Sequence, residues 1–80
     1  MSPSLVTEIV LQIRDLVRTR RGRLAVVTVG APTRFEPSQV IRVLADQLRG
    51  LGLDGFEIDI APIETDTFEL LSLEFAWNRP

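Results

Sequence analysis

The sequence of 80 residues contains no histidine, cysteine, tyrosine or lysine. These four residue types supply most of the neutral-pH acid–base groups, thiolate nucleophiles, Schiff bases and transition-metal ligands in proteins. A serine or threonine nucleophile normally needs a neighbouring general base, most often histidine, to take up its proton. Only carboxylates, arginines and a few hydroxyls remain for chemistry. We therefore predict that the chain is not an enzyme and has no catalytic residue, metal site or cofactor.

The missing cysteine and histidine also limit how so short a chain is stabilised. Their absence excludes disulfides and a structural zinc site. Eighty residues make one domain, predicted over residues 1–80, and domains of this size are marginal without cross-links or a partner. The hydrophobic content is nevertheless 45%, which points to a dense core, a self-associating surface, or both. We expect a homo-oligomer or a complex with a protein partner.

Long apolar runs are absent as well. The runs that are present fall far short of the roughly 20 residues that a membrane-spanning helix needs. The first residues show neither the basic segment nor the uninterrupted apolar core of a secretory signal. We expect a cytoplasmic protein without a membrane partner.

Charge is distributed unevenly, although the net charge is only −2. Residues 1–53 contain eight arginines and four acidic residues, whereas residues 54–80 contain seven acidic residues and only Arg79. The two halves can attract each other within the fold, and the exclusive use of arginine can reflect a GC-rich genome. A pI of about 5.0, with no aromatic residues beside the basic cluster, argues against nucleic acid as a partner.

Apolar spacing predicts two helices. The first spans residues 3–20, begins at Ser2-Pro3 and is closed by Gly22; the second begins at Phe35-Glu36-Pro37 and ends at Gly50. The stripe expected to be buried on the first helix consists of Leu5, Val6, Ile9, Val10, Ile13, Leu16 and Val17, and that on the second helix of Val40, Ile41, Leu44 and Leu48.

Three strands are predicted as well. Residues 23–29 are apolar on both faces, which is typical of a central strand, and Gly30-Ala31-Pro32 is expected to end it. Residues 56–61 alternate between apolar and acidic, and residues 68–77 form the last strand, with a bulge near Leu70-Leu71. The short polar segment between these two strands favours an antiparallel hairpin. The predicted fold is α/β (α+β), α-β-α-β-β, with two helices packed on one face of a three-stranded mixed sheet.

This order, together with several stretches, resembles the nickel metallochaperone family that matures nickel–iron hydrogenase and urease. The stretches are Ser4-Leu5 with Ile9-Val10, Val27 to Gly30 followed by Phe35-Glu36-Pro37, Phe56 to Ile60, and Phe68 to Phe75. Together they cover nearly the whole chain, and each is a common α/β pattern.

The chain departs from this family at both of the family's metal sites. The family begins Met-His-Glu and holds nickel with that histidine, whereas this chain begins Met1-Ser2-Pro3. The family's zinc loop carries two Cys-x-x-Cys pairs, and here Pro62 to Thr67 bridges directly. The resemblance therefore implies a scaffold without metal, which docks to a GTPase partner or a hydrogenase precursor and self-associates.

An arginine cluster is the first candidate for contact with a partner. Arg18, Arg20, Arg21 and Arg23 form the densest charge in the chain. Such a cluster is suited to phosphate or to an acidic protein surface. It is equally typical of a solvated helix C-terminus, where positive charge complements the helix dipole.

The last strand is the second candidate. Phe75 and Trp77, expected on one face with Leu71 and Leu73, either complete the core or offer an edge for strand addition to a partner or to a second copy. Val27 and Val29, on the second face of the first strand, are a further contact candidate.

Acidic residues are expected to line the polar face of the sheet. Glu57, Asp59 and Glu74 have oxygens that suit a hard cation, and a close pair of them would raise one carboxyl pKa for acid–base work. Alternating acids on an exposed sheet are ordinarily solvated charge that opposes aggregation. We favour that interpretation.

The expected function is a non-catalytic protein-interaction or assembly module. In its sharper form the chain resembles a metal-free nickel-metallochaperone scaffold, acting in maturation of the nickel–iron-hydrogenase type or as a small subunit of such a complex. The alternative is a ferredoxin-like small-molecule-binding or regulatory module, with its ligand against the open sheet face.

Overall fold

The element order α-β-α-β-β is confirmed in a computed structural model that describes residues 3–76. The elements are η1 (Pro3–Val6), α1 (Thr7–Thr19), β1 (Arg23–Pro32), α2 (Pro37–Gly50), β2 (Glu57–Ile63) and β3 (Glu69–Ala76). Within residues 3–76, no helix combines the length and the apolarity needed to cross a bilayer.

β1 is the central strand of a mixed sheet with the order β2-β1-β3. It pairs in parallel with β2 and antiparallel with β3, as a mixed sheet requires. The predicted hairpin of the last two strands is wrong, because the connection after β2 crosses the end of β1 and β3 returns on the other side. β1 is the only strand that is apolar on both faces, so it gains most from the central position. β2 and β3 are consequently the two edges of the sheet.

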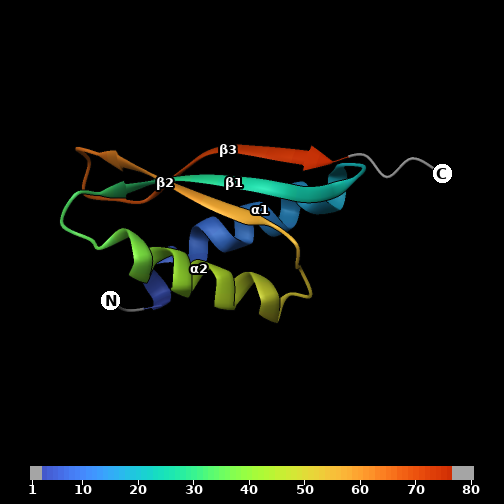
Figure 1. The fold of residues 1–80 in the computed structure, drawn as a ribbon, viewed down its shortest axis with the longest axis horizontal. Helices are drawn as coiled ribbons and strands as arrows, with labels where there is room; N and C mark the ends of the chain where they lie inside the picture. Colours follow the sequence, from blue (N-terminus) through green and yellow to red (C-terminus); the bar gives the residue numbers. More distant parts are fainter. Residues whose placement is uncertain (1–2, 77–80) are drawn as a thin grey trace.

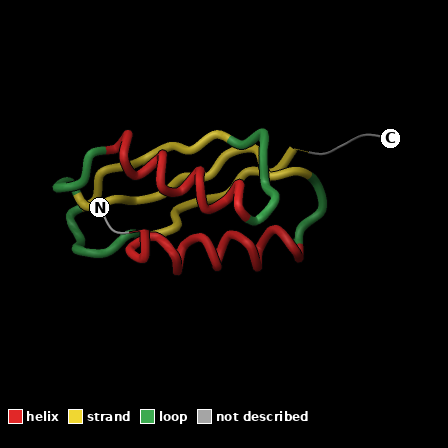
Figure 2. The backbone as a smooth tube through the Cα atoms, turned by 90° about the horizontal axis from the view of Figure 1, so that it is seen from below, coloured by secondary structure: helices red, strands yellow, loops and turns green. Residues whose placement is uncertain are grey.

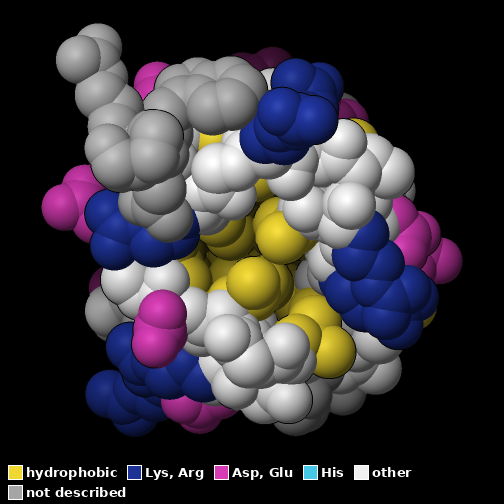
Figure 3. All heavy atoms as spheres, turned by 90° about the vertical axis from the view of Figure 1, so that its right-hand side faces the viewer, with side chains coloured by type: hydrophobic (Ala, Val, Ile, Leu, Met, Phe, Trp, Pro, Cys, Tyr) yellow, Lys and Arg dark blue, Asp and Glu magenta, His cyan; other side chains and the backbone are white. Residues whose placement is uncertain are grey.

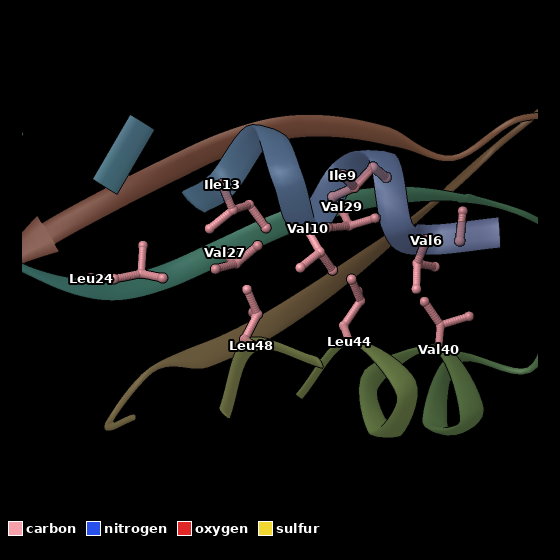
Figure 4. Close-up of a cluster of buried hydrophobic side chains, with 11 residues drawn as sticks. Val6, Ile9, Val10, Ile13, Leu24, Val27, Val29, Val40, Leu44 and Leu48 are labelled. Atoms are coloured by element: carbon pink, nitrogen blue, oxygen red, sulfur yellow. The ribbon is translucent and has the colours of Figure 1, made fainter. Parts of the chain in front are cut away.

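Both helices pack on the same face of the sheet, as predicted, and no described element covers the opposite face (Figure 1, Figure 2). Side chains from η1, α1, β1 and α2 point into one shared layer (Figure 4). The buried hydrophobic residues are Val6, Ile9, Val10, Ile13, Leu24, Val27, Val29, Ala31, Val40, Leu44, Ala45 and Leu48. Burial of this apolar area is the main source of stability, because the chain has no cross-link.

The first helix differs from its prediction at both ends. Its opening turn, η1, is a 3₁₀ helix, and the predicted cap Ser2 lies outside the described residues. α1 ends at Thr19, whose hydroxyl donates to the Leu16 carbonyl at 3.0 Å. Gly22 therefore lies in the turn that leads into β1, with φ of 98°. A Cβ there would come within 2.7 Å of the Ala76 carbonyl oxygen, so the close approach of β3 requires glycine.

β1 continues through the residues predicted to end it. Gly30 is an extended residue inside the strand, paired with Ala61 and Glu69 on its two sides. A Cβ at this position would lie 3.0 Å from two carbon atoms of Ile63 and 3.5 Å from Leu71. Gly30 therefore gives room to apolar side chains from both edge strands on the open face of the sheet.

The predicted bulge in the last strand is confirmed. Thr28 pairs with Ser72 and Val29 with Leu70, so Leu71 is an extra residue in β3. The bulge removes Leu71 from the face that it was predicted to share with Leu73. Leu73 packs against the core, whereas Leu71 is 46% exposed.

Three other residues of the predicted apolar stripes are also exposed. Leu5 and Leu16 of the first stripe are 47% and 37% exposed, and Ile41 of the second is 37% exposed. The apolar face of each helix is therefore wider than the part of it that the core buries. Leu5 and Leu16 lie on the side of the first helix that faces β3, and they lead to the candidate site.

Candidate interaction groove

Two cavities between the first helix and β3 form a groove along this edge of the sheet, which we call the α1–β3 groove. The first cavity has a volume of about 440 Å³ and is lined on the helix side by Leu5, Glu8, Ile9 and Gln12. The second has a volume of about 230 Å³ and is lined on the helix side by Leu16 and Arg20. Leu70 of β3 lines both, so the two cavities adjoin.

The helix wall of the groove follows from residue spacing. Leu5, Gln12 and Leu16 follow one another at spacings of seven and four positions, so they lie on one side of the helix. That side is next to the buried stripe of Ile9 and Ile13 but does not reach the core. Leu5 and Leu16, each partly exposed, thus form an apolar shoulder of the helix beside the edge strand, and Glu8, Gln12 and Arg20 lie among them.

The strand wall is apolar as well, and it borders a free backbone edge. Leu70, Leu73 and Phe75 are half-buried against the core and line the groove. On the side away from β1, no described strand pairs with β3. Its outward N–H and C=O groups are therefore available to another strand.

One end of the groove is acidic. Glu8, Asp66 and Glu69 line the first cavity together with Arg34. The Arg34 guanidinium donates to the Asp66 carboxylate at 3.2 Å and lies 4.9 Å from the centroid of the Phe35 ring. Glu8 and Glu69 have no ion pair among the described residues. This end therefore carries uncompensated negative charge.

A pair of aromatic rings closes the acidic end. The centroids of Phe35 and Phe68 are 4.9 Å apart with an interplanar angle of 42°, a geometry that favours aromatic contact. Phe35 follows β1 and Phe68 precedes β3, so the ring pair joins the two loops at this end of the sheet.

The other end is basic, and the predicted arginine cluster lies there. Arg18 is in the last turn of α1, Arg20 and Arg21 are in the following turn, and Arg23 begins β1. All four are exposed, and none has an ion pair within residues 3–76. Figure 3 shows this end of the molecule, where arginine side chains, with acidic side chains between them, surround a central group of hydrophobic side chains.

The structure brings part of the predicted site together. Arg20 and Phe75 line the same cavity, although they are 55 positions apart in the sequence. Arg18 instead borders a separate cavity of about 180 Å³ with Val17, Leu51 and Leu53. The cluster therefore faces two surfaces, and only Arg20 lines the groove.

Other predicted contact residues lie elsewhere. Val27 and Val29 were expected on an accessible face of the first strand, and this is wrong, because both are fully buried under the helices. Trp77 lies outside the described residues. The prediction missed the exposure of Leu5 and Leu16, and the available signal was an apolar stripe wider than one helix normally buries.

The acidic residues of the sheet are solvated, as favoured above. Glu57 and Glu74 flank Val26 from opposite sides, and Asp59 pairs with Thr28 one row further along. Among the described residues, no three acidic side chains are grouped as a metal site would require.

The expected attraction between the basic and acidic halves is realised at one point. Among residues 3–76, the ion pairs are Arg14–Asp15 within α1 and Arg34–Asp66 between the halves. Both are exposed, so each contributes little to stability. Most of the charge asymmetry is therefore displayed on the surface.

Comparison of the chain with protein-family models, with curated proteins and with solved structures finds no match.

Proposed function

We propose that this chain is a non-catalytic protein-interaction or assembly module that binds a polypeptide in the α1–β3 groove. The observation that carries the proposal is a groove, lined by both apolar and charged side chains, beside a strand edge that no described strand pairs with. An extended polypeptide that adds to such an edge gains backbone hydrogen bonds from the strand and places its apolar side chains in the groove. A cytoplasmic location and a protein partner or homo-oligomer belong to the same proposal.

Its sharper form retains the nickel-metallochaperone resemblance. The scaffold would serve in hydrogenase-type maturation, or as a small subunit of such a complex, without binding metal itself. What supports this form is the set of sequence stretches quoted above and the α-β-α-β-β order. In this form the occupant of the groove would be a maturation partner or a second scaffold.

The proposal is tested with a charge placed in the groove and the same charge placed outside it. Leu16 lines the groove, whereas Leu11 of the same helix lines neither cavity and is 41% exposed. Leu16→Glu should abolish polypeptide binding, because it replaces an apolar contact with a charged carboxylate that would have to give up its water. Leu11→Glu should leave binding intact.

Native mass spectrometry of the three proteins, purified mildly from the organism's own cells, reads out the result. We expect a polypeptide bound to the wild type and to Leu11→Glu and absent from Leu16→Glu, with circular dichroism showing that both variants are folded. A polypeptide retained on folded Leu16→Glu, or no polypeptide on the wild type, would overturn the proposal.

A small-molecule-binding or regulatory module is the second candidate. The cavity of about 440 Å³ favours it, because that volume lies within the range of small-molecule sites. It also lies beside Arg34 and Phe35, which directly follow the carboxyl end of β1, where ligands bind in many parallel α/β sheets. A small bound mass on the wild-type monomer, in place of a polypeptide, would favour this candidate.

A further inference from the structure

We infer that the α1–β3 groove binds a second copy of this chain, with the β3 edges of the two copies paired antiparallel across a two-fold axis. The inference rests on the proposed function, because it names the polypeptide that occupies the same groove. It is carried by the order of charges along the groove, by the apolar shoulder of the helix and by the free edge of β3.

The order of charges selects an antiparallel partner. The first helix and β3 run in the same direction, since Glu8 lies at the end where β3 begins and Arg20 at the end where it finishes. A two-fold axis across an antiparallel strand pair reverses that direction in the second copy. The acidic end of each groove then faces the basic end of the other, whereas a parallel partner would bring like charges together.

The apolar shoulder contributes to the burial in such a dimer. An axis perpendicular to the sheet keeps both helical layers on the same side, so the first helices of the two copies lie beside each other over the strand seam. Leu5 and Leu16, now exposed, face this seam with half-buried Leu70 and Leu73. Their apolar surface is removed from water in the dimer.

The other edge of the sheet explains why association stops at two copies. A continuous sheet of six strands would have β2 at both ends. β2 carries Pro62, which has no N–H to donate to a further strand, and α2 packs against this strand. The interface is therefore self-complementary and closed.

Charge reversal tests this geometry. Glu8 and Arg20 are twelve residues apart, about 18 Å along the helix, and antiparallel docking places Glu8 of one copy near Arg20 of the other. We expect the wild-type chain, purified alone, to dimerise in sedimentation equilibrium. Glu8→Arg and Arg20→Glu should each weaken the dimer about tenfold, because each change creates two like-charge contacts. Arg18→Glu, which changes charge outside the groove, should leave the dimer unchanged.

Two combinations separate this mechanism from a general loss of stability. The double variant Glu8→Arg/Arg20→Glu should dimerise nearly as well as the wild type, because both intermolecular contacts are restored with reversed sign. An equimolar mixture of the two single variants should form a mixed dimer more readily than either forms its own. A double variant as weak as the singles would overturn the inference.

The outcomes also separate this inference from the proposed function. A purified chain that stays monomeric, while protein from cells carries a different polypeptide that Leu16→Glu removes, overturns the self-association and leaves the proposed function standing. A monomeric chain that carries no polypeptide in either preparation overturns both.

Discussion

The two edges of the sheet differ in what covers them and in what they expose. α2 packs against β2, and the exposed residues of that strand include Glu57, Asp59 and Pro62. The first helix lies beside β3 with a groove between them, and β3 carries Leu70, Leu71 and Leu73 with no proline. The β2 edge is opposed to strand pairing by its proline and by α2, whereas the β3 edge, which carries Glu69, Glu74 and the bulge at Leu71, has an open groove beside it.

The difference shows that a small core can leave apolar side chains uncovered along one edge without unfolding the domain. Both helices bury one stripe against β1, and this is enough to define the fold. The extra apolar residues of the first helix fall on its β3 side, where the sheet is one strand too narrow to cover them. A fourth strand beside β3 would complete that layer.

The largest expected effect separates the core from the groove. Leu44 of α2 is fully buried, so Leu44→Ala should lower the free energy of unfolding by about 2–5 kcal/mol. Leu16→Ala should lower it by less than about 1 kcal/mol, since Leu16 is partly in solvent. Urea denaturation at a concentration where the protein is monomeric measures both. Equal losses would mean that the groove is part of the core.

A second prediction concerns the point where the two edge strands approach each other on the open face. Gly30→Val should destabilise the fold by about 1–3 kcal/mol, because the new side chain meets Ile63 and Leu71. Ile63→Ala in the same protein should recover part of the loss, since it removes the two nearest carbon atoms. Thermal denaturation of both variants is the measurement, and absence of recovery would place the strain elsewhere.

A third prediction compares one charge on each edge. Leu71→Lys on β3 should weaken association about tenfold, the direction expected when lysine is placed at a pairing edge. Asp59→Lys on β2 should leave association unchanged, because that strand is not expected to pair. Sedimentation equilibrium of the two variants at matched concentrations decides the matter. An effect of Asp59→Lys equal to that of Leu71→Lys would show that the edges are equivalent.

The smallest expected effect concerns the acids of β2. Glu57→Gln with Asp59→Asn should change the free energy of unfolding by no more than about 0.5 kcal/mol, because both side chains are exposed. Association should not change either. Isothermal titration with Mg²⁺ or Ca²⁺ should give the same heats for the wild type and for the double variant. A heat of binding specific to the wild type would identify a cation site there.

Local features of the fold could be predicted from the sequence. Periodicity identified both helices, the two-sided apolarity of residues 23–29 identified the central strand, and a change of phase near Leu71 identified the bulge. Each of these depends on neighbouring residues and on the geometry of a single element. Strand order does not, and the short polar connection suggested a hairpin that the sheet does not contain.

The candidate site was predicted only in part, for a physical reason. Arg20 and Phe75 were both named from the sequence, but their convergence depends on β3 lying beside the first helix. Val27 and Leu16 illustrate the main error, which concerns which apolar residues are buried. The sequence pattern of an apolar residue that faces the core does not differ from that of one that faces a groove. Val27 is buried because it lies on the central strand beneath the helices, whereas Leu16 lies beside β3, past the edge of the core.

The most direct test of the central claim, that β3 and not β2 is the interacting edge, is a dilution series of amide ¹H–¹⁵N spectra of the purified chain. We predict that the concentration-dependent shifts cluster at Glu69–Ala76 and along the helix shoulder at Leu5, Gln12 and Leu16, with β2 and the exposed face of α2 unaffected. Shifts centred on Glu57–Ile63, or shifts absent from β3 while sedimentation shows a dimer, would contradict the account.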